Sequence, residues 1–181
     1  LDPVDRMADA LGAVDDSKRL SPALRHVVAQ NIPDSALDWG LGQASVDEID
    51  ALGIGRANDL AMLRALAALR RPPVHLLVDG YRLRLSSLPQ QGIVGGDHLV
   101  LSIAAASVLA KVHRDGLMLD LEGHHPGYGF AQHMGYGTAA HRRAIASCGP
   151  SSAHRLSWRL LDSDGRESAR SRRRGTADRA D

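Results

Sequence analysis

The chain has 181 residues, of which 44% are hydrophobic and 3% aromatic, so it is long enough for one domain with a mainly aliphatic core. Its 22 basic and 21 acidic residues leave a net charge of +1, which excludes the overall basic excess of many nucleic-acid-binding proteins but not a local basic patch. Cys148 is the only cysteine, which excludes an intrachain disulfide and a zinc site built on cysteines.

The N-terminal residues carry neither the positive start nor the apolar core of a signal peptide, and no apolar run is long enough to span a membrane. We therefore expect a cytoplasmic protein without a membrane partner. The first residue is Leu1 rather than methionine, which suggests a fragment, a processed chain or a trimmed chain.

The first predicted helix has a recognisable start. Ser21 places a capping hydroxyl before Pro22, a favoured first-turn residue, and apolar residues then follow at helical spacing over residues 23–32. Residues 37–44, with one tryptophan and two glycines, are expected to form a short strand.

Two further helices are predicted before the middle of the chain. Ser45 and Glu48 match a capping box, which predicts a short helix over residues 46–52. Leucines and alanines recur at steps of three and four over residues 60–69, as in an amphipathic helix that packs on a sheet. This helix must end before Pro72.

Two short apolar runs predict neighbouring strands. Residues 74–78 lead into Asp79, and residues 91–96 lead into Asp97. The Ala-rich residues 102–118 then predict a long helix.

The last third of the chain changes in character. Residues 123–138, rich in glycine, histidine and tyrosine, predict a loop, and helical periodicity returns over residues 139–147. Residues 162–181 alternate Asp, Glu and Arg with Ser and Gly, so we expect a disordered tail after one domain at residues 1–161.

Asp79 and Asp97 are candidate metal ligands. If their two strands lie side by side, both carboxylates meet at one edge of the sheet, where their oxygens suit a hard ion such as magnesium. Two such ions can activate a water and stabilise the leaving oxygen of a phosphodiester. An Asp-Gly pair after a strand is also a common turn signal, so each aspartate alone admits a purely structural interpretation.

Histidines cluster in the same region as the predicted loop. Their spacing matches no zinc motif, so we place no metal on them and expect surface or hydrogen-bonding roles. The four are His124, His125, His133 and His141.

Two tyrosines in that loop are flanked by glycines, which allow a close approach of the backbone to a ligand. Tyr128 and Tyr136 can each be a ring that stacks on a sugar or base, or part of a tightly packed Gly-Tyr turn.

Seven ordered blocks, together with HRLSW at residues 154–158, resemble the ribonuclease HII family from Leu1 to about Arg159. The helix and the Gly-Tyr loop are the most specific of them. The blocks are DDSKRL (15–20), ASVDEID (44–50), LVDG (77–80), VGGD (94–97), SIAAASVLAKVHRD (102–115), PGYGFAQHMGYGT (126–138) and GP (149–150).

The resemblance implies a ribonuclease H-like α/β fold, a mixed sheet flanked by helices, in which four acidic residues hold two Mg²⁺ or Mn²⁺ ions. Asp79 matches the third acidic residue of the family and Asp97 the fourth. Tyr136 matches the tyrosine that packs on the sugar beside the cleaved junction, and Lys18 matches the lysine of the DSK motif near the substrate phosphates. A capping or surface role for Lys18 is the alternative.

The implied activity is a monomeric endonuclease of ribonucleotide excision repair. It hydrolyses the RNA strand of RNA–DNA hybrids and cuts DNA on the 5′ side of embedded ribonucleotides. The alternative is a non-catalytic remnant that binds nucleic acid or comes from a degraded gene. An unrelated metal-dependent phosphatase would need a different acidic constellation, and we find none.

The chain departs from the family pattern at its start. Family members begin with a strand carrying DEAGRG, which supplies the first two acidic residues and a glycine-rich loop that senses the ribose 2′-hydroxyl. The chain begins after that segment, so we expect an incomplete and inactive form. Gly95 and Met134 stand where lysines are common, which should weaken phosphate binding.

Overall fold

The structure is a computed structural model, and it describes residues 21–157. Lys18 and the predicted tail at residues 162–181 lie outside this range. None of the helices in residues 21–157 is both long enough and apolar enough to cross a membrane.

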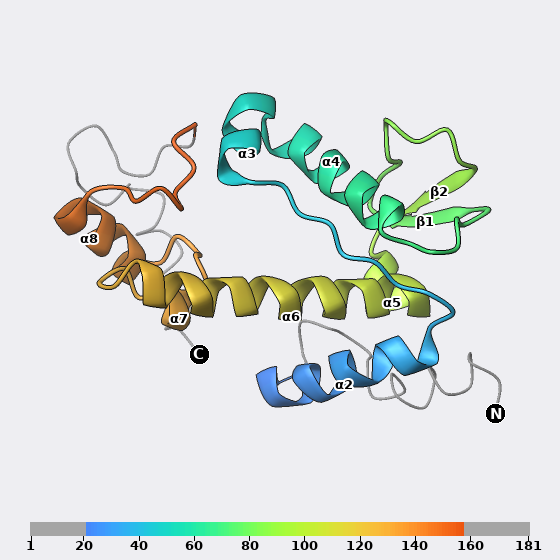
Figure 1. Cartoon of the computed structure of the whole chain (residues 1–181), viewed down its shortest axis with the longest axis horizontal. Helices are drawn as coiled ribbons and strands as arrows, with labels where there is room; N and C mark the ends of the chain where they lie inside the picture. Colours follow the sequence, from blue (N-terminus) through green and yellow to red (C-terminus); the bar gives the residue numbers. More distant parts are fainter. Residues whose placement is uncertain (1–20, 158–181) are drawn as a thin grey trace, which may run out of the picture.

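A long helix, α6 (Leu101–His124), forms the axis of the described part of the chain. Figure 1 shows α2 (Pro22–Ser35) below it, and α3 (Val46–Leu52), α4 (Ile54–Ala67) and the strands above it. Short α5 (Gly96–Leu99) lies at one end of α6, and α7 (Phe130–His133) and α8 (Ala139–Cys148) lie toward the other end. The helices predicted from the sequence are all confirmed, and α5 and α7 are additions, α5 after the second predicted strand and α7 within the predicted loop.

The two strands pair in parallel. β1 (Leu76–Asp79) runs beside β2 (Gln90–Ile93), with Asp79 opposite Ile93. Leu76 and Val78 face the apolar side of α4, while Leu77 points to the other face and remains partly exposed. Because α4 covers the sheet, the amphipathic pattern of residues 60–69 is explained.

Two other cores use α6. Val28 and Ile32 of α2 pack against Ala105 and Val108, which is completely buried. A third core, around Phe130, packs against the C-terminal part of the same helix. Helix α6 therefore holds the N-terminal and C-terminal parts of the described chain together.

The prediction of a strand over residues 37–44 is wrong. The segment is extended but pairs with no strand, and it lies directly on α4. A Cβ atom added at Gly42 would lie 2.1 Å from the carbonyl oxygen of Ala61, and one at Gly40 would lie 2.4 Å from that of Ala65. The two glycines therefore serve a close approach of backbone to helix, which their sequence alone did not reveal.

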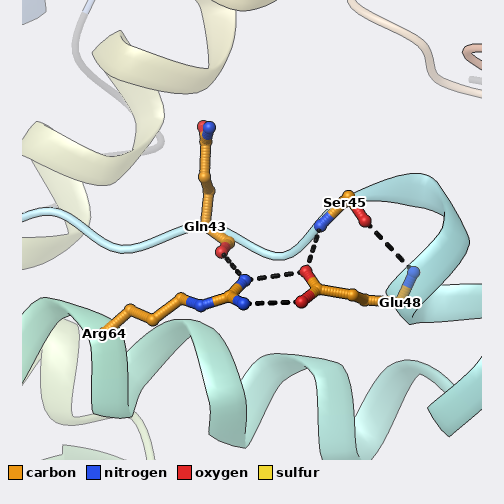
Figure 2. Close-up of polar contacts among 4 residues, drawn as sticks. All are labelled: Gln43, Ser45, Glu48 and Arg64. Atoms are coloured by element: carbon orange, nitrogen blue, oxygen red, sulfur yellow. Dashed lines mark hydrogen bonds and ion pairs between the residues drawn. The ribbon is translucent and has the colours of Figure 1, made fainter.

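A polar cluster fixes the start of α3 (Figure 2). The predicted capping box is present: Ser45 Oγ accepts a hydrogen bond from the Glu48 N–H, and Glu48 accepts one from the Ser45 N–H. Arg64 of α4 donates to both carboxylate oxygens of Glu48 and to the carbonyl of Gln43. The Arg64 guanidinium and the Ser45 N–H together lower the pKa of Glu48 from 4.5 to about 2.

Glu48→Gln is expected to destabilise the chain at neutral pH and to reduce its sensitivity to acid. Because the folded pKa of Glu48 is depressed, its stabilising contribution is present above about pH 4.5 and is lost as the pH falls toward about 2. Urea unfolding of both proteins across this range checks the expectation. A constant difference between them at every pH would contradict it.

Candidate active site

Asp79 ends β1 and is exposed at the carboxyl edge of the sheet. Gly80 follows with a φ of +77°, so the chain turns away directly after the carboxylate. Asp79 Oδ1 accepts a hydrogen bond of 2.9 Å from the Gly96 N–H. This contact joins the end of β1 to the start of α5.

Asp97 is held differently from the prediction. It does not end a strand: β2 stops at Ile93, Gly95 turns the chain with a φ of +66°, and Asp97 lies in the first turn of α5. Its side chain is 5% exposed, with Oδ1 3.6 Å from His98 Nε2. The sequence could not show that β2 ends at Ile93, because Val94 continues the apolar run past this last paired residue.

The two aspartates nevertheless belong to one local structure. Asp79 binds the backbone N–H of the residue that immediately precedes Asp97. Gly96 is in close contact with α6 as well, since a Cβ there would lie 2.7 Å from Ile103 Cδ1. The end of β1, the start of α5 and the start of α6 thus converge on this glycine.

The donor chemistry of this pair fits a divalent cation, since carboxylate oxygens are the ligands that Mg²⁺ and Mn²⁺ prefer. Within residues 21–157, however, no group of three or more His, Cys, Asp or Glu side chains is arranged to hold a metal ion. This part of the chain therefore offers two carboxylates rather than a complete ligand set.

Of the two tyrosines, one fits the packed-turn interpretation and the other fits that of a ring open to a ligand. Tyr128 is buried in the core around Phe130, and its hydroxyl donates to the Gly149 carbonyl over 2.7 Å. Tyr136 is 58% exposed. The packed-turn interpretation is therefore right for Tyr128, whereas the ring of Tyr136 is open to a ligand.

Two cations of α6 lie near the Tyr136 ring. Lys111 Nζ is 5.6 Å and Arg114 Cζ is 5.3 Å from the ring centroid. Arg114 also donates to the carbonyl of Met134 over 2.8 Å, and Lys111 forms an ion pair with Asp115. An exposed ring beside two cations is a suitable surface for a sugar–phosphate backbone.

Lys111 and Arg114 were not singled out from the sequence, although both lie in the SIAAASVLAKVHRD block. Their spacing of three residues places them on one face of a helix, which was the available signal. Lys111 lies about 15 Å along the helix axis from Leu101, which begins α6 beside the aspartates. Helix α6 thus connects the acidic pair to the cluster of Tyr136, Lys111 and Arg114.

Three of the four histidines of the loop have hydrogen-bonding rings. His133 and His141 are buried, and each ring contacts a backbone carbonyl. His124 is exposed and contacts the carbonyl of Asp120.

Comparison with known proteins agrees with these features. The ribonuclease HII family model matches residues 5–161. The chain is 46% identical over 151 residues to a ribonuclease HII of Nocardia farcinica, an alignment that covers 83% of this chain and 60% of that protein. It is 52% identical over 149 residues to one of a Synechococcus strain, covering 81% and 75% of the two chains.

The fold also has a solved counterpart. The crystal structure of ribonuclease H2 from Pyrococcus horikoshii superposes with a TM-score of 0.69 at 21% identity, covering 87% of this chain and 81% of that one. This likeness confirms the α/β fold of the ribonuclease H2 type. The sequence matches and the extent of the family model together show that the chain belongs to the ribonuclease HII family.

Proposed function

We propose that the chain contributes to an endonuclease that hydrolyses the RNA strand of RNA–DNA hybrids and cuts on the 5′ side of ribonucleotides embedded in DNA. The observation that carries this proposal is the joining of Asp79 to the α5 turn that holds Asp97, at one end of the helix that also carries Lys111 and Arg114. Family membership supplies the substrate class.

Asp79 and Asp97 are the residues that would hold Mg²⁺ or Mn²⁺. When bound, such ions lower the pKa of a water and neutralise the charge that develops on the phosphate. Asp79 is exposed and ready to meet a cation from solvent, whereas Asp97 is buried and fixed by its turn. In this proposal Asp79 is the solvent-accessible metal ligand and Asp97 is the rigidly held one.

Lys111, Arg114 and Tyr136 are proposed to bind the nucleic acid. The two cations neutralise phosphates, which makes binding dependent on salt, and the exposed ring packs on a sugar or base. Lys18, which lies outside the described residues, is proposed to add a phosphate contact. We also propose that the protein acts as a cytoplasmic monomer.

A second candidate is binding without cleavage. Residues 21–157 supply only two carboxylates in the acidic constellation, so the 181-residue chain can hold a hybrid duplex and leave it intact. This candidate shares the binding surface with the first and differs only in the chemistry.

Tyr136→Ala tests the binding surface. Loss of an aromatic stacking contact of about 1–3 kcal/mol is expected to weaken binding to a duplex with one ribonucleotide by about 5- to 150-fold. The melting temperature should change little, because the ring is 58% exposed. Fluorescence anisotropy and thermal unfolding measure the two effects.

Tyr136→Phe is the matched control, because it keeps the ring and should bind almost as well as the unchanged chain. If Tyr136→Ala instead loses binding and thermal stability to the same degree, the ring packs within the fold and does not bind substrate. An unchanged affinity for Tyr136→Ala would remove Tyr136 from the proposed surface.

A further inference from the structure

Three buried imidazole rings form a cluster next to the Tyr136 backbone. They are His133 of α7, His141 of α8 and His154 of the following turn, each at most 8% exposed. The rings of His133 and His141 stack with centroids 4.1 Å apart, and Nε2 of His141 lies 3.0 Å from Nε2 of His154. Phe130 packs against all three rings.

The hydrogen bonds determine where the protons reside. Both the Ser151 N–H, at 3.0 Å, and the Ser151 hydroxyl, at 2.8 Å, contact His154 Nδ1. Because the backbone N–H can only donate, Nδ1 is an acceptor and the ring proton of His154 is on Nε2. His154 Nε2–H then donates to His141 Nε2. The proton of His141 is consequently on Nδ1, which donates to the Tyr136 carbonyl over 3.0 Å.

His133 obeys the same logic. The Gly135 N–H donates to its Nδ1 over 3.2 Å, and its Nε2–H donates to the Tyr128 carbonyl over 2.8 Å. All three rings are thus neutral and satisfied at both nitrogens. Consistent with this, burial lowers the pKa of both His141 and His154, and the neighbouring imidazoles lower it further.

Apart from the bond with His141, the hydrogen bonds of the Tyr136 backbone are local: its N–H donates to the His133 carbonyl over 2.8 Å. Tyr136 lies between Gly135, with a φ of +73°, and Gly137, and glycines leave a turn flexible. Its carbonyl accepts from Thr138 N–H at 2.7 Å as well as from His141. Within residues 21–157, the side chain that hydrogen-bonds to the Tyr136 backbone is that of His141.

The far end of the histidine relay is anchored as well. The Asp50 carboxylate of α3 accepts hydrogen bonds from the Leu156 and Ser157 N–H groups. The turn that carries His154 is thus tied to a separate helix, and the relay connects that fixed point to Tyr136.

We propose that His141 and His154 are positioning residues, which hold the Tyr136 backbone through a directed chain of neutral imidazole hydrogen bonds so that the ring remains over Lys111 and Arg114. This inference rests on the proposed role of Tyr136 in substrate binding. It assigns the histidines no contact with substrate and no metal.

The proton pattern is tested first on the unchanged 181-residue chain. Long-range ¹H–¹⁵N spectra of the imidazoles at neutral pH should show His141 as the Nδ1–H tautomer and both His133 and His154 as the Nε2–H tautomer. A protonated His141, or its Nε2–H tautomer, would overturn the relay without reference to any activity.

The positioning role is tested with a matched pair of variants at one site. In His141→Asn the amide nitrogen can take the place of Nδ1 and keep the bond to the Tyr136 carbonyl. In His141→Gln the amide oxygen can take the place of Nε2, accept from the His154 Nε2–H and keep only that contact. Each variant loses one hydrogen bond, so their losses of stability should be similar.

The two variants should differ in the ring and in binding. For His141→Gln, the Tyr136 ring resonances should move and duplex affinity should fall toward that of Tyr136→Ala. For His141→Asn, both should remain close to those of the unchanged chain, with affinity within about twofold. Equal changes in both variants would show that His141 serves packing alone and would overturn the proposal.

These experiments distinguish a failure of the positioning proposal from a failure of the proposed nuclease function. If the unchanged chain does not bind the duplex, the proposed function fails, and the tautomers and the Tyr136 ring resonances still decide whether the relay positions the tyrosine. If either variant does not fold, the tautomer spectrum of the unchanged chain still tests the relay on which the positioning depends, and a pattern other than the expected one overturns the proposal.

Discussion

A version of the chain extended at its N-terminus by a family strand carrying DEAGRG is expected to cut a duplex that contains one ribonucleotide, while the 181-residue chain leaves the same duplex intact. The expected difference in rate is at least about a thousandfold, the scale on which loss of essential catalytic groups is felt. The in-line displacement needs charge neutralisation at both the attacking and the leaving oxygen, and the two carboxylates that residues 21–157 supply to the proposed site hold too few cations for this.

Asp79→Asn and Asp97→Asn in the extended version are the controls. The asparagine oxygen can still accept the hydrogen bond from the Gly96 N–H, so Asp79→Asn should retain the fold while it abolishes cleavage. The measurement is denaturing electrophoresis of an end-labelled strand with Mg²⁺ or Mn²⁺, beside thermal unfolding. Equal cleavage by the 181-residue and extended chains would mean that other residues, such as Asp15 and Asp16, complete the acidic set.

Gly42→Ala is expected to destabilise the fold by about 3 kcal/mol or more, a large part of the stability of a typical domain. The new Cβ would lie 2.1 Å from the Ala61 carbonyl oxygen and 2.4 Å from the Ala65 nitrogen. Both are backbone atoms inside a hydrogen-bonded helix, so neither can move without breaking α4 or displacing the segment before α3.

Gly55→Ala in the same helix is the matched control. No atom lies within 4 Å of a Cβ built at this position, and its backbone is helical, so the substitution should be neutral or stabilising by about 0.5–1 kcal/mol. Urea unfolding of the two variants measures the contrast. Similar stabilities would show that the segment over α4 can shift to accommodate a methyl group.

Local signals in the sequence predicted the helices well. The Ser21 cap and the Ser45–Glu48 capping box each mark a helix start in the structure, because these hydrogen bonds involve residues only three apart. The extended segment over α4 was mistaken for a strand, since the partner of Gly40 and Gly42 is a helix some twenty residues away along the chain. Close approach between distant backbones leaves no local pattern.

The sequence supplied some residues of the candidate site, but not Lys111 and Arg114 and not the arrangement of the site. The family pattern identified Asp79, Asp97 and Tyr136, whereas the placement of Asp97 on a helical turn depends on where β2 stops pairing. The two contacts that connect His154 to Tyr136 through His141 join residues 13 and 5 positions apart, and only the folded loop brings them together. Spacing alone could show neither contact.

Helix α6 sets the distance between the acidic pair and the cluster of Tyr136, Lys111 and Arg114. Its start is fixed against Gly96 through Ile103, and Lys111 and Arg114 lie further along the same helix. The distance and the angle between the acidic pair and the two cations are therefore set by the helix, which rises about 1.5 Å and rotates about 100° for each residue. One residue inserted between Ile103 and Lys111 would advance and rotate both cations relative to Gly96, so a duplex bound at the proposed surface would lie out of register with the carboxylates.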